Sequence, residues 1–241
     1  MAKRLPFPSR GGGRPAPRWR RRRPRGRGSS LAAVATAVGV AVCARLFLLQ
    51  GFRVPSRAME DTVLAGEYLL VDKMSYGVRI PFVRWRLPGW AEPRAGDVVV
   101  FEAAHDDRRL LVKRCVAVAG QLVEGRHKVI YVDGRRSIDP PRSKYVDAHI
   151  LDPAHSPRDS FGPVRVPPDA VFVVGDNRDR SRDSRHWGAL PVSAIVGRAR
   201  RVYWSCEPVG TPGDGSWGDA LRSLLTLPSR LRWRRLGAGV R

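Results

Sequence analysis

The sequence predicts a mainly β, antiparallel domain anchored by one N-terminal transmembrane helix. From residue 67 onward, short runs rich in Val, Ile, Phe and Tyr alternate with turn residues, and no helical period extends past ten residues. The only long apolar run of the chain lies before them, at residues 31–50. With 241 residues and 43% hydrophobic residues, the chain is long enough to bury a core.

The basic charge is concentrated before the apolar run. Lys and Arg number 44 against 22 Asp and Glu, and residues 1–28 hold 11 of these cations and no acid. The first acidic residue is Glu60. A basic arm of this kind is typical of proteins that meet nucleic acid or an anionic membrane surface.

The apolar run LAAVATAVGVAVCARLFLLQ, residues 31–50, favours the membrane, because Arg45 is its only charge. Twenty helical residues extend about 30 Å, the thickness of a bilayer core. A buried core helix and a cleaved signal peptide with a small-residue site at residues 42–44 remain alternatives. We expect a cytoplasmic arm at residues 1–29, a signal-anchor helix at 30–50 and an extracytoplasmic domain beyond it, in a single-pass protein of the cell membrane.

Six strands are predicted within an extracytoplasmic β domain at residues 51–206. Asp133-Gly134 offers a tight hairpin turn. The Pro-, Asp- and Arg-rich stretch 135–168 indicates a long loop or insertion. The predicted strands cover residues 67–73, 97–102, 110–119, 128–134, 171–176 and 195–204.

Residues 207–241 have a linker-like composition followed by a basic stretch, and we expect a frayed basic tail; an amphipathic segment on anionic lipid is the alternative. Cys115 and Cys206 could form a disulfide or remain two buried thiols. His149 and His155 lie in a loop without a metal-binding pattern, so we expect no metal.

Lys113 is the first candidate for chemistry. Its strand neighbours, among them Val112 and Cys115, are apolar. Burial in apolar surroundings lowers the pKa of a lysine, as a lysine general base near neutral pH requires. The alternative is an exposed lysine on an edge strand.

The second candidate is VFVVGDNRDRSRDSRHWG, residues 171–188, where a hydrophobic strand runs into a dense polar array. Four Arg and three Asp follow Gly175 within residues 176–185. Such groups cannot be buried unless they are ion-paired and hydrogen-bonded. A solvated turn is the alternative; an array of this length between apolar segments favours a braced platform beside a site.

The segment GDNRDRSRDSRHWG, residues 175–188, resembles the C-terminal signature of type I signal peptidases. Three further blocks resemble the family in its own order: the N-terminal anchor, PSRAMEDT at 55–62, and GDVVVF with VKRCVAVAG within 96–120. The resemblance implies a membrane-anchored serine endopeptidase that removes signal peptides from exported preproteins after small residues at −1 and −3. It implies a mainly β fold with an apolar face toward the membrane, a Ser nucleophile, a Lys general base and no cofactor.

The resemblance also implies roles for individual residues. Lys113 matches the general base, and Ser181 matches the hydroxyl that orients its amine. Ser56 matches the serine whose hydroxyl helps form the oxyanion hole. Asp183 and Arg185 match a supporting ion pair, and the start of the signature is matched by Asp176, Asn177 and Arg178. No substrate-binding residue is assigned.

Position 58 matches the nucleophile, and this chain has Ala58 there, before Met59. A methyl group can neither lose a proton nor attack a carbonyl. The sequence also departs from the family at Asp61, where Pro is usual, and at residues 117–121, where Gly-x-Pro-Gly-Asp is usual. Several altered positions around one site are typical of relaxed selection.

Three functions follow as hypotheses. The chain could be a peptidase with a relocated nucleophile, Ser56 or Thr62. It could be a catalytically impaired homologue that binds signal peptides, preproteins or an active signal peptidase; this is the reading we favour. It could instead be a membrane-tethered binder of anionic polymers. Nucleic acid is not expected, because Trp19 is the only aromatic near the clustered arginines of the arm. The partners expected are signal peptides of exported preproteins and membrane lipid.

Overall fold

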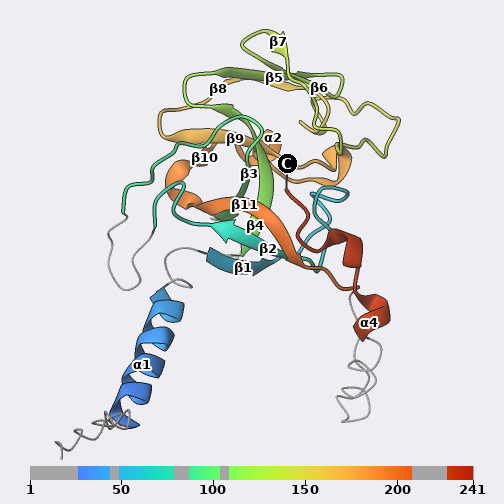
Figure 1. Cartoon of the computed structure of the whole chain (residues 1–241). Coiled ribbons are helices and arrows are strands. Elements are labelled where there is room, and N and C mark those ends of the chain that lie inside the picture. Colours follow the sequence, from blue (N-terminus) through green and yellow to red (C-terminus); the bar gives the residue numbers. More distant parts are fainter. Residues whose placement is uncertain (1–26, 44–48, 79–86, 104–108, 208–226, 241) are drawn as a thin grey trace, which may run out of the picture. The chain divides into compact units, whose positions relative to one another are not determined.

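The structure is a computed structural model, and it describes residues 27–43, 49–78, 87–103, 109–207 and 227–240 (Figure 1). The chain divides into two compact units, residues 1–40 and 41–241. The basic arm predicted for residues 1–29 lies almost wholly outside the described residues. The two units are described separately below.

The helix predicted for residues 30–50 is observed as α1 (Arg27–Cys43), which has 17 residues. Its predicted C-terminal end is wrong, because Leu49 and Gln50 belong to strand β1 and pair with Asp72 and Val71 of a neighbouring strand. Sheet pairing therefore overrides the apolar composition of these last two residues. No helix among the described residues has both the length and the apolar character of a membrane-spanning helix.

The larger sheet contains seven strands in the order β1-β2-β11-β3-β4-β9-β10, and all of its neighbours are antiparallel. The antiparallel, mainly β fold that the sequence predicts is thus confirmed. The strands are β1 (Leu49–Arg53), β2 (Tyr68–Asp72), β3 (Val98–Glu102), β4 (Leu110–Val118), β9 (Ala170–Val174), β10 (Leu190–Pro191) and β11 (Ile195–Trp204).

The smaller sheet contains four strands in the order β7-β6-β5-β8 and lies at one end of the domain, at the top of Figure 1. The strands are β5 (Leu122–Arg126), β6 (Val129–Val132), β7 (Arg135–Arg136) and β8 (Phe161–Arg165). The predicted Asp133-Gly134 turn joins β6 to β7, and both residues have positive φ, 50° and 75°. These angles suit a two-residue hairpin turn of type I′.

Strand β3 shows how the core is divided. Val98 and Val100 pack into one apolar cluster, while Val99 and Phe101 pack into another. Because successive residues of a strand point to opposite faces, the larger sheet is buried on both sides at its centre. A third cluster joins the two sheets, through Val116, Ala117, Phe172 and Val174 of the larger and Val123 and Ile130 of the smaller.

The C-terminal segment, defined here as residues 227–240, differs from the frayed tail expected. It contains the short helix α4 (Leu227–Arg230) and the 3₁₀ turn η4 (Trp233–Arg235), and it runs back along the domain (Figure 1). Backbone bonds join it to β11, including Val202 N–H to the Ala238 carbonyl at 2.9 Å. Val240 is buried in the first apolar cluster. Segments that pair with a strand and bury an apolar side chain do not fray.

The remaining expectations concern the insertion and the cysteines. Residues 139–160 are irregular, as predicted for part of 135–168, whereas residues 161–165 form β8. Cys115 and Cys206 are both free thiols, so the disulfide alternative is excluded.

Candidate active site

The Lys113 amine lies against the Ser181 hydroxyl. Lys113 Nζ donates to Ser181 Oγ at 2.6 Å, and Ser181 Oγ donates to the Asp183 carboxylate at 2.6 Å. Because the Ser181 hydroxyl donates its hydrogen bond to Asp183, its oxygen can only accept the hydrogen bond from Lys113. The arrangement fixes the direction of the amine, and the structure thus brings together three residues that the sequence singled out.

The position of Lys113 in the larger sheet explains why its amine contacts Ser181. Arg114, its neighbour on β4, pairs in register with Val174, the last residue of β9. Gly175 follows directly, so the 175–188 segment begins beside the part of β4 that carries Lys113. Only 3% of Lys113 is exposed, which excludes the alternative of an exposed edge lysine.

Burial lowers the pKa of Lys113 from its ordinary value of 10.5 to about 8. The Asp183 carboxylate raises the pKa and Arg185 lowers it, but burial has the largest effect. A neutral amine with a free lone pair is therefore accessible just above neutral pH, and that form can accept a proton.

Asp183 and Arg185 form the supporting ion pair that the resemblance implies. Arg185 Nε donates to Asp183 Oδ1 at 2.8 Å, and the Asp183 carboxylate also accepts from Gly175 N–H at 2.9 Å. Burial alone would raise the pKa of Asp183, but the positive charges of Arg185 and Lys113 and the hydrogen bonds lower it. Asp183 is thus held as an anion beneath Ser181, with 0% exposure.

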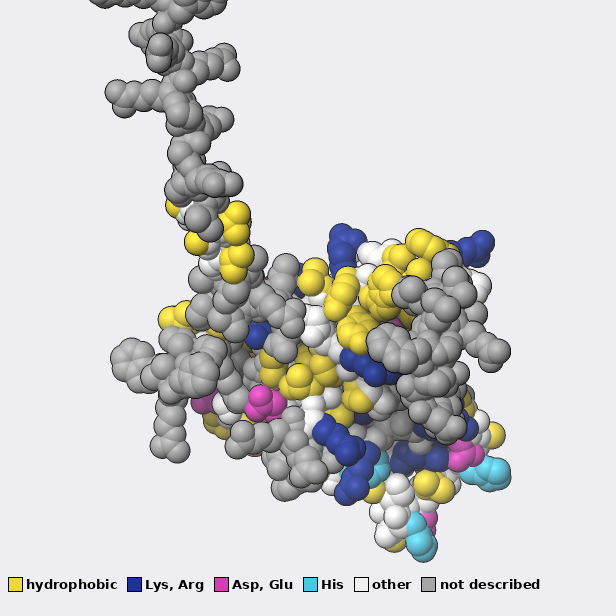
Figure 2. All heavy atoms as spheres, turned by 90° about the horizontal axis from the view of Figure 1, so that it is seen from below, with side chains coloured by type: hydrophobic (Ala, Val, Ile, Leu, Met, Phe, Trp, Pro, Cys, Tyr) yellow, Lys and Arg dark blue, Asp and Glu magenta, His cyan; other side chains and the backbone are white. Residues whose placement is uncertain are grey.

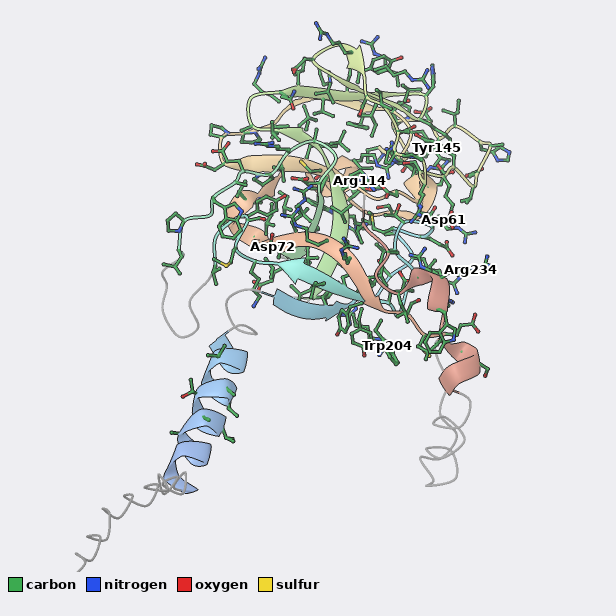
Figure 3. All side chains as sticks on the ribbon, in the orientation of Figure 1. Asp61, Asp72, Arg114, Tyr145, Trp204 and Arg234 are labelled. Carbon is green, nitrogen blue, oxygen red and sulfur yellow. The ribbon has the colours of Figure 1, made fainter. Side chains whose placement is uncertain are left out.

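Asp176 ties three parts of the chain together. Arg114 binds both of its carboxylate oxygens, at 2.8 and 2.7 Å, and the Thr62 hydroxyl donates to the same group at 2.5 Å. Figure 3 places Arg114 in the interior of the domain, and it is 5% exposed. The sequence did not single out Arg114, which directly follows Lys113. A bidentate Arg–carboxylate pair of this kind stabilises the fold and fixes the orientation of both side chains.

Position 58 is held against the 175–188 segment. Asn177 N–H donates to the Ala58 carbonyl at 3.0 Å, and Ala58 is 6% exposed. A Cβ added to Gly175 would overlap both the Ser181 side chain and the Ala58 carbonyl. Only glycine allows such close approach, so Gly175 is the point where position 58 and the Lys113–Ser181 pair meet.

The two other hydroxyls near position 58 are placed differently. Thr62 is buried, and its hydroxyl is bonded to Asp176, so it is not available as a nucleophile. Ser56 is half-buried and precedes Ala58 by two residues in the same loop. Among the hydrogen bonds described, none joins Ser56 to Lys113 or Ser181. The oxyanion role of Ser56 concerns a bound substrate, which the structure does not contain, so it stays a prediction.

The polar array of residues 176–185 is largely buried and bonded, as a braced platform requires. Arg178, 3% exposed, pairs with Asp139 at 2.6 Å. Asp179 accepts from Val146 N–H and Asp147 N–H at 2.7 and 2.8 Å. The interpretation as a solvated turn is therefore wrong. These contacts tie the 139–160 insertion to the site, which the sequence did not predict.

A cavity of about 570 Å³ lies beside the smaller sheet, but Lys113 and Ala58 do not line it. Its walls include Phe161 and Arg185. Across the described part of the chain, no group of three or more His, Cys, Asp or Glu side chains is placed to hold a metal. The site offers proton transfer by Lys113, but at position 58 it offers no group that attacks.

Comparison with known proteins identifies the family of the chain. The family profile described as "Signal peptidase, peptidase S26" matches residues 27–204, which is well over half of the chain. A probable signal peptidase I-1 of Synechocystis is 32% identical over 181 residues, covering 72% of this chain and 81% of its own. A signal peptidase I of Bacillus caldolyticus is 31% identical over 172 residues, covering 68% and 86%.

A probable signal peptidase I-2 of Synechocystis is 30% identical over 186 residues, covering 75% of each chain. The solved signal peptidase I of Enterococcus faecalis overlaps less, with a TM-score of 0.35 and 22% identity over 44% of this chain and 96% of that one. The profile match and the identities of about 30% decide the assignment: the chain belongs to the type I signal peptidases, the peptidase S26 family.

Proposed function

We propose that this chain binds signal peptides of exported preproteins in the processing of these proteins, and that it does not hydrolyse them because Ala58 stands at the nucleophile position. Family membership supports a role in signal-peptide processing and preproteins as the class of substrate. The single observation that carries the proposal is an assembled base site beside a position that lacks an attacking atom. Lys113, Ser181 and Asp183 form a continuous bonded chain.

The chemistry expected of a serine at position 58 shows what is missing. Its hydroxyl would give its proton to the neutral Lys113 amine while its oxygen attacks the carbonyl carbon of the scissile bond. The carbonyl oxygen would become an oxyanion, for which Ser56 is the donor implied by the resemblance. The protonated Lys113 would then give its proton to the leaving amine, and water would release the acyl group. Alanine at position 58 removes only the attacking hydroxyl; the base Lys113 is still present.

The variant Ala58→Ser tests the proposal. The unmodified chain should bind a synthetic signal peptide with Ala at −1 and −3, measured by fluorescence anisotropy, and should leave it uncut. Ala58→Ser should cleave it, measured by mass spectrometry of the products, because the base and its orienting hydroxyl are present. Loss of the nucleophile costs roughly 10⁶-fold in kcat in subtilisin, so even partial recovery of a comparable loss is measurable.

The control is Ala58→Ser combined with Lys113→Ala, which should be inactive again. If the unmodified chain cleaves the peptide and Ser56→Ala stops the cleavage, the nucleophile has moved to Ser56 and the proposal is wrong. If neither the unmodified chain nor Ala58→Ser binds the peptide, the binding function is wrong as well.

We also propose a location: a single-pass protein of the cell membrane with the N-terminus in the cytoplasm and the β domain outside. The support is the sequence, in which 11 cations precede the apolar run 31–50. Exposed aromatic and aliphatic side chains on the domain, among them Trp90, Tyr203 and Trp233, are consistent with contact to lipid. Figure 2 shows hydrophobic side chains among Lys and Arg on one face.

A further inference from the structure

The loop that carries position 58, residues 54–67, is closed at its base and held on one side by the 175–188 segment. Val54 N–H donates to the Glu67 carbonyl at 2.8 Å, and Gly66 N–H donates to the Val54 carbonyl at 2.9 Å. On the side of the 175–188 segment, Asn177 binds Ala58 and Asp176 binds Thr62. We call residues 54–67 the nucleophile loop.

A second contact on the same loop comes from the C-terminal segment. Arg235 binds both carboxylate oxygens of Glu67, through Nε and Nη2. Its Nη2 also donates to the Thr62 carbonyl at 2.9 Å. The Arg235 guanidinium thus joins Thr62, four residues after position 58, to Glu67, the last residue of the loop. A planar fork of donors suits this double contact, which a lysine could not reproduce.

The Glu67 carboxylate is buried and has several hydrogen-bond donors, while the Arg235 side chain is 20% exposed. Glu67 is 0% exposed, and its carboxylate also accepts from Leu64 N–H at 2.9 Å and from the Ser205 hydroxyl at 2.7 Å. The backbone bonds between the C-terminal segment and β11 hold Arg235 in place, for example Gly237 N–H to the Val202 carbonyl at 2.8 Å.

Arg235 lies outside the region that the family profile matches. The family profile matches residues 27–204, so the C-terminal segment lies beyond the matched region. We infer that Arg235 is a positioning residue: it gives the nucleophile loop a second support besides the contacts of Asp176 and Asn177, so that a side chain at position 58 stays aligned with Lys113. The inference rests on the proposed function, since alignment has a purpose only for a bound peptide or a restored nucleophile.

The test uses the full chain with Ala58→Ser as the reference. Adding Arg235→Ala should lower kcat by about tenfold or more with KM within about twofold, because about 1 Å of misplacement can cost on the order of 100-fold. Adding Arg235→Lys should recover part of the loss, since an ammonium can pair with Glu67 but cannot reproduce the fork. The matched control is Arg234→Ala, which removes the same charge from an exposed side chain one residue away (Figure 3).

A second measurement does not depend on catalysis. In the unmodified chain, the amides of Thr62 and Val63 bond to the Met59 carbonyl at 3.1 and 2.7 Å. Arg235→Ala should speed hydrogen exchange of these two amides about tenfold or more, and Arg234→Ala should not. If Arg235→Ala fails to fold, Glu67→Gln combined with Arg235→Ala is measured in its place, because it removes the unpaired buried charge.

The outcomes separate the two proposals. If Ala58→Ser cleaves and Arg235→Ala behaves like Arg234→Ala in both measurements, the positioning role is wrong and the proposed function stands. If Ala58→Ser does not cleave the peptide but Arg235→Ala speeds hydrogen exchange in the nucleophile loop, the prediction of restored cleavage is wrong and the positioning role of Arg235 stands. An equal loss in both Arg variants would also overturn the inference, since it would reflect charge alone.

Discussion

A buried lysine destabilises a folded chain whenever it carries a proton. Burial lowers the pKa of Lys113 to about 8, whereas the unfolded chain keeps a pKa near 10.5. The unfolded chain therefore binds the extra proton between about pH 8 and 10.5, and the contribution of Lys113 to the free energy of unfolding rises with pH across this window. At pH 7 the penalty is about 3 kcal/mol.

Lys113→Met should therefore stabilise the fold at pH 7 by up to about 3 kcal/mol, and the gain should shrink toward zero as the pH approaches 10.5. Urea unfolding of both chains at pH 7 and pH 10 measures this difference. Tyrosines and thiols titrate alike in the two chains, so their effect cancels in the difference between the two free energies of unfolding at each pH. A gain that does not change with pH would mean that the Lys113 amine is hydrated.

The residues of the site were predictable to different degrees. Lys113, Ser181, Asp183 and Arg185 lie in segments with a recognisable local pattern, and the structure brings all four together. Arg235 had no such signal, because its partner Glu67 is 168 positions away and an arginine in a basic tail resembles any other. A hydrogen bond between distant segments depends on the fold, and no short pattern contains it.

At the scale of elements, one buried carboxylate makes several contacts to the 139–160 insertion. Asp179 accepts from two backbone amides of the insertion, Val146 and Asp147, and from Lys128 Nζ at 2.9 Å. Asp179→Ala should remove all three bonds and leave the two backbone amides without this acceptor, whereas Lys128 keeps its bond to the Asp147 carbonyl, at a cost of about 1–3 kcal/mol. Hydrogen exchange at Val146 and Asp147 should accelerate, and trypsin should cut the insertion faster.

Asp152→Ala is the control for that change. Asp152 lies in the same insertion, and its side chain accepts from Ala154 N–H at 2.8 Å within its own turn. Its loss should leave the Val146 and Asp147 amides as protected as before. Equal acceleration in the two variants would show that the insertion is held by its ends and not by Asp179.

Six strands were predicted from their composition, and all six are present. Two of the strands that the sequence missed, β5 and β8, have interrupted patterns. Gly125 and two charged residues fall within β5, and Gly162-Pro163 lies within β8, where proline removes a ladder donor. In β5, Gly125 lies against the Phe161 ring, where a Cβ would overlap it. Tertiary contact, and not strand propensity, makes both strands.

At the scale of the whole molecule, the proposed orientation can be tested directly. Protease added to intact cells or spheroplasts should digest the β domain and spare a small N-terminal fragment, because the 11 cations of residues 1–28 would be retained in the cytoplasm. Immunoblots with tags at either end follow the two parts. Protection of the domain together with loss of the arm would reverse the orientation.

The contact between Arg235 and the Thr62 carbonyl has a consequence for the order in which the protein matures. The two residues are 173 positions apart. Ribosomes add about 5–20 residues per second, so roughly 10–35 s pass between the synthesis of Thr62 and that of its partner. During that time Glu67 has no arginine beside it and the nucleophile loop lacks one of its two supports. The second support of the nucleophile loop therefore forms only after residue 235 has been synthesised, and until then a growing polypeptide holds position 58 by the contacts of Asp176 and Asn177 alone.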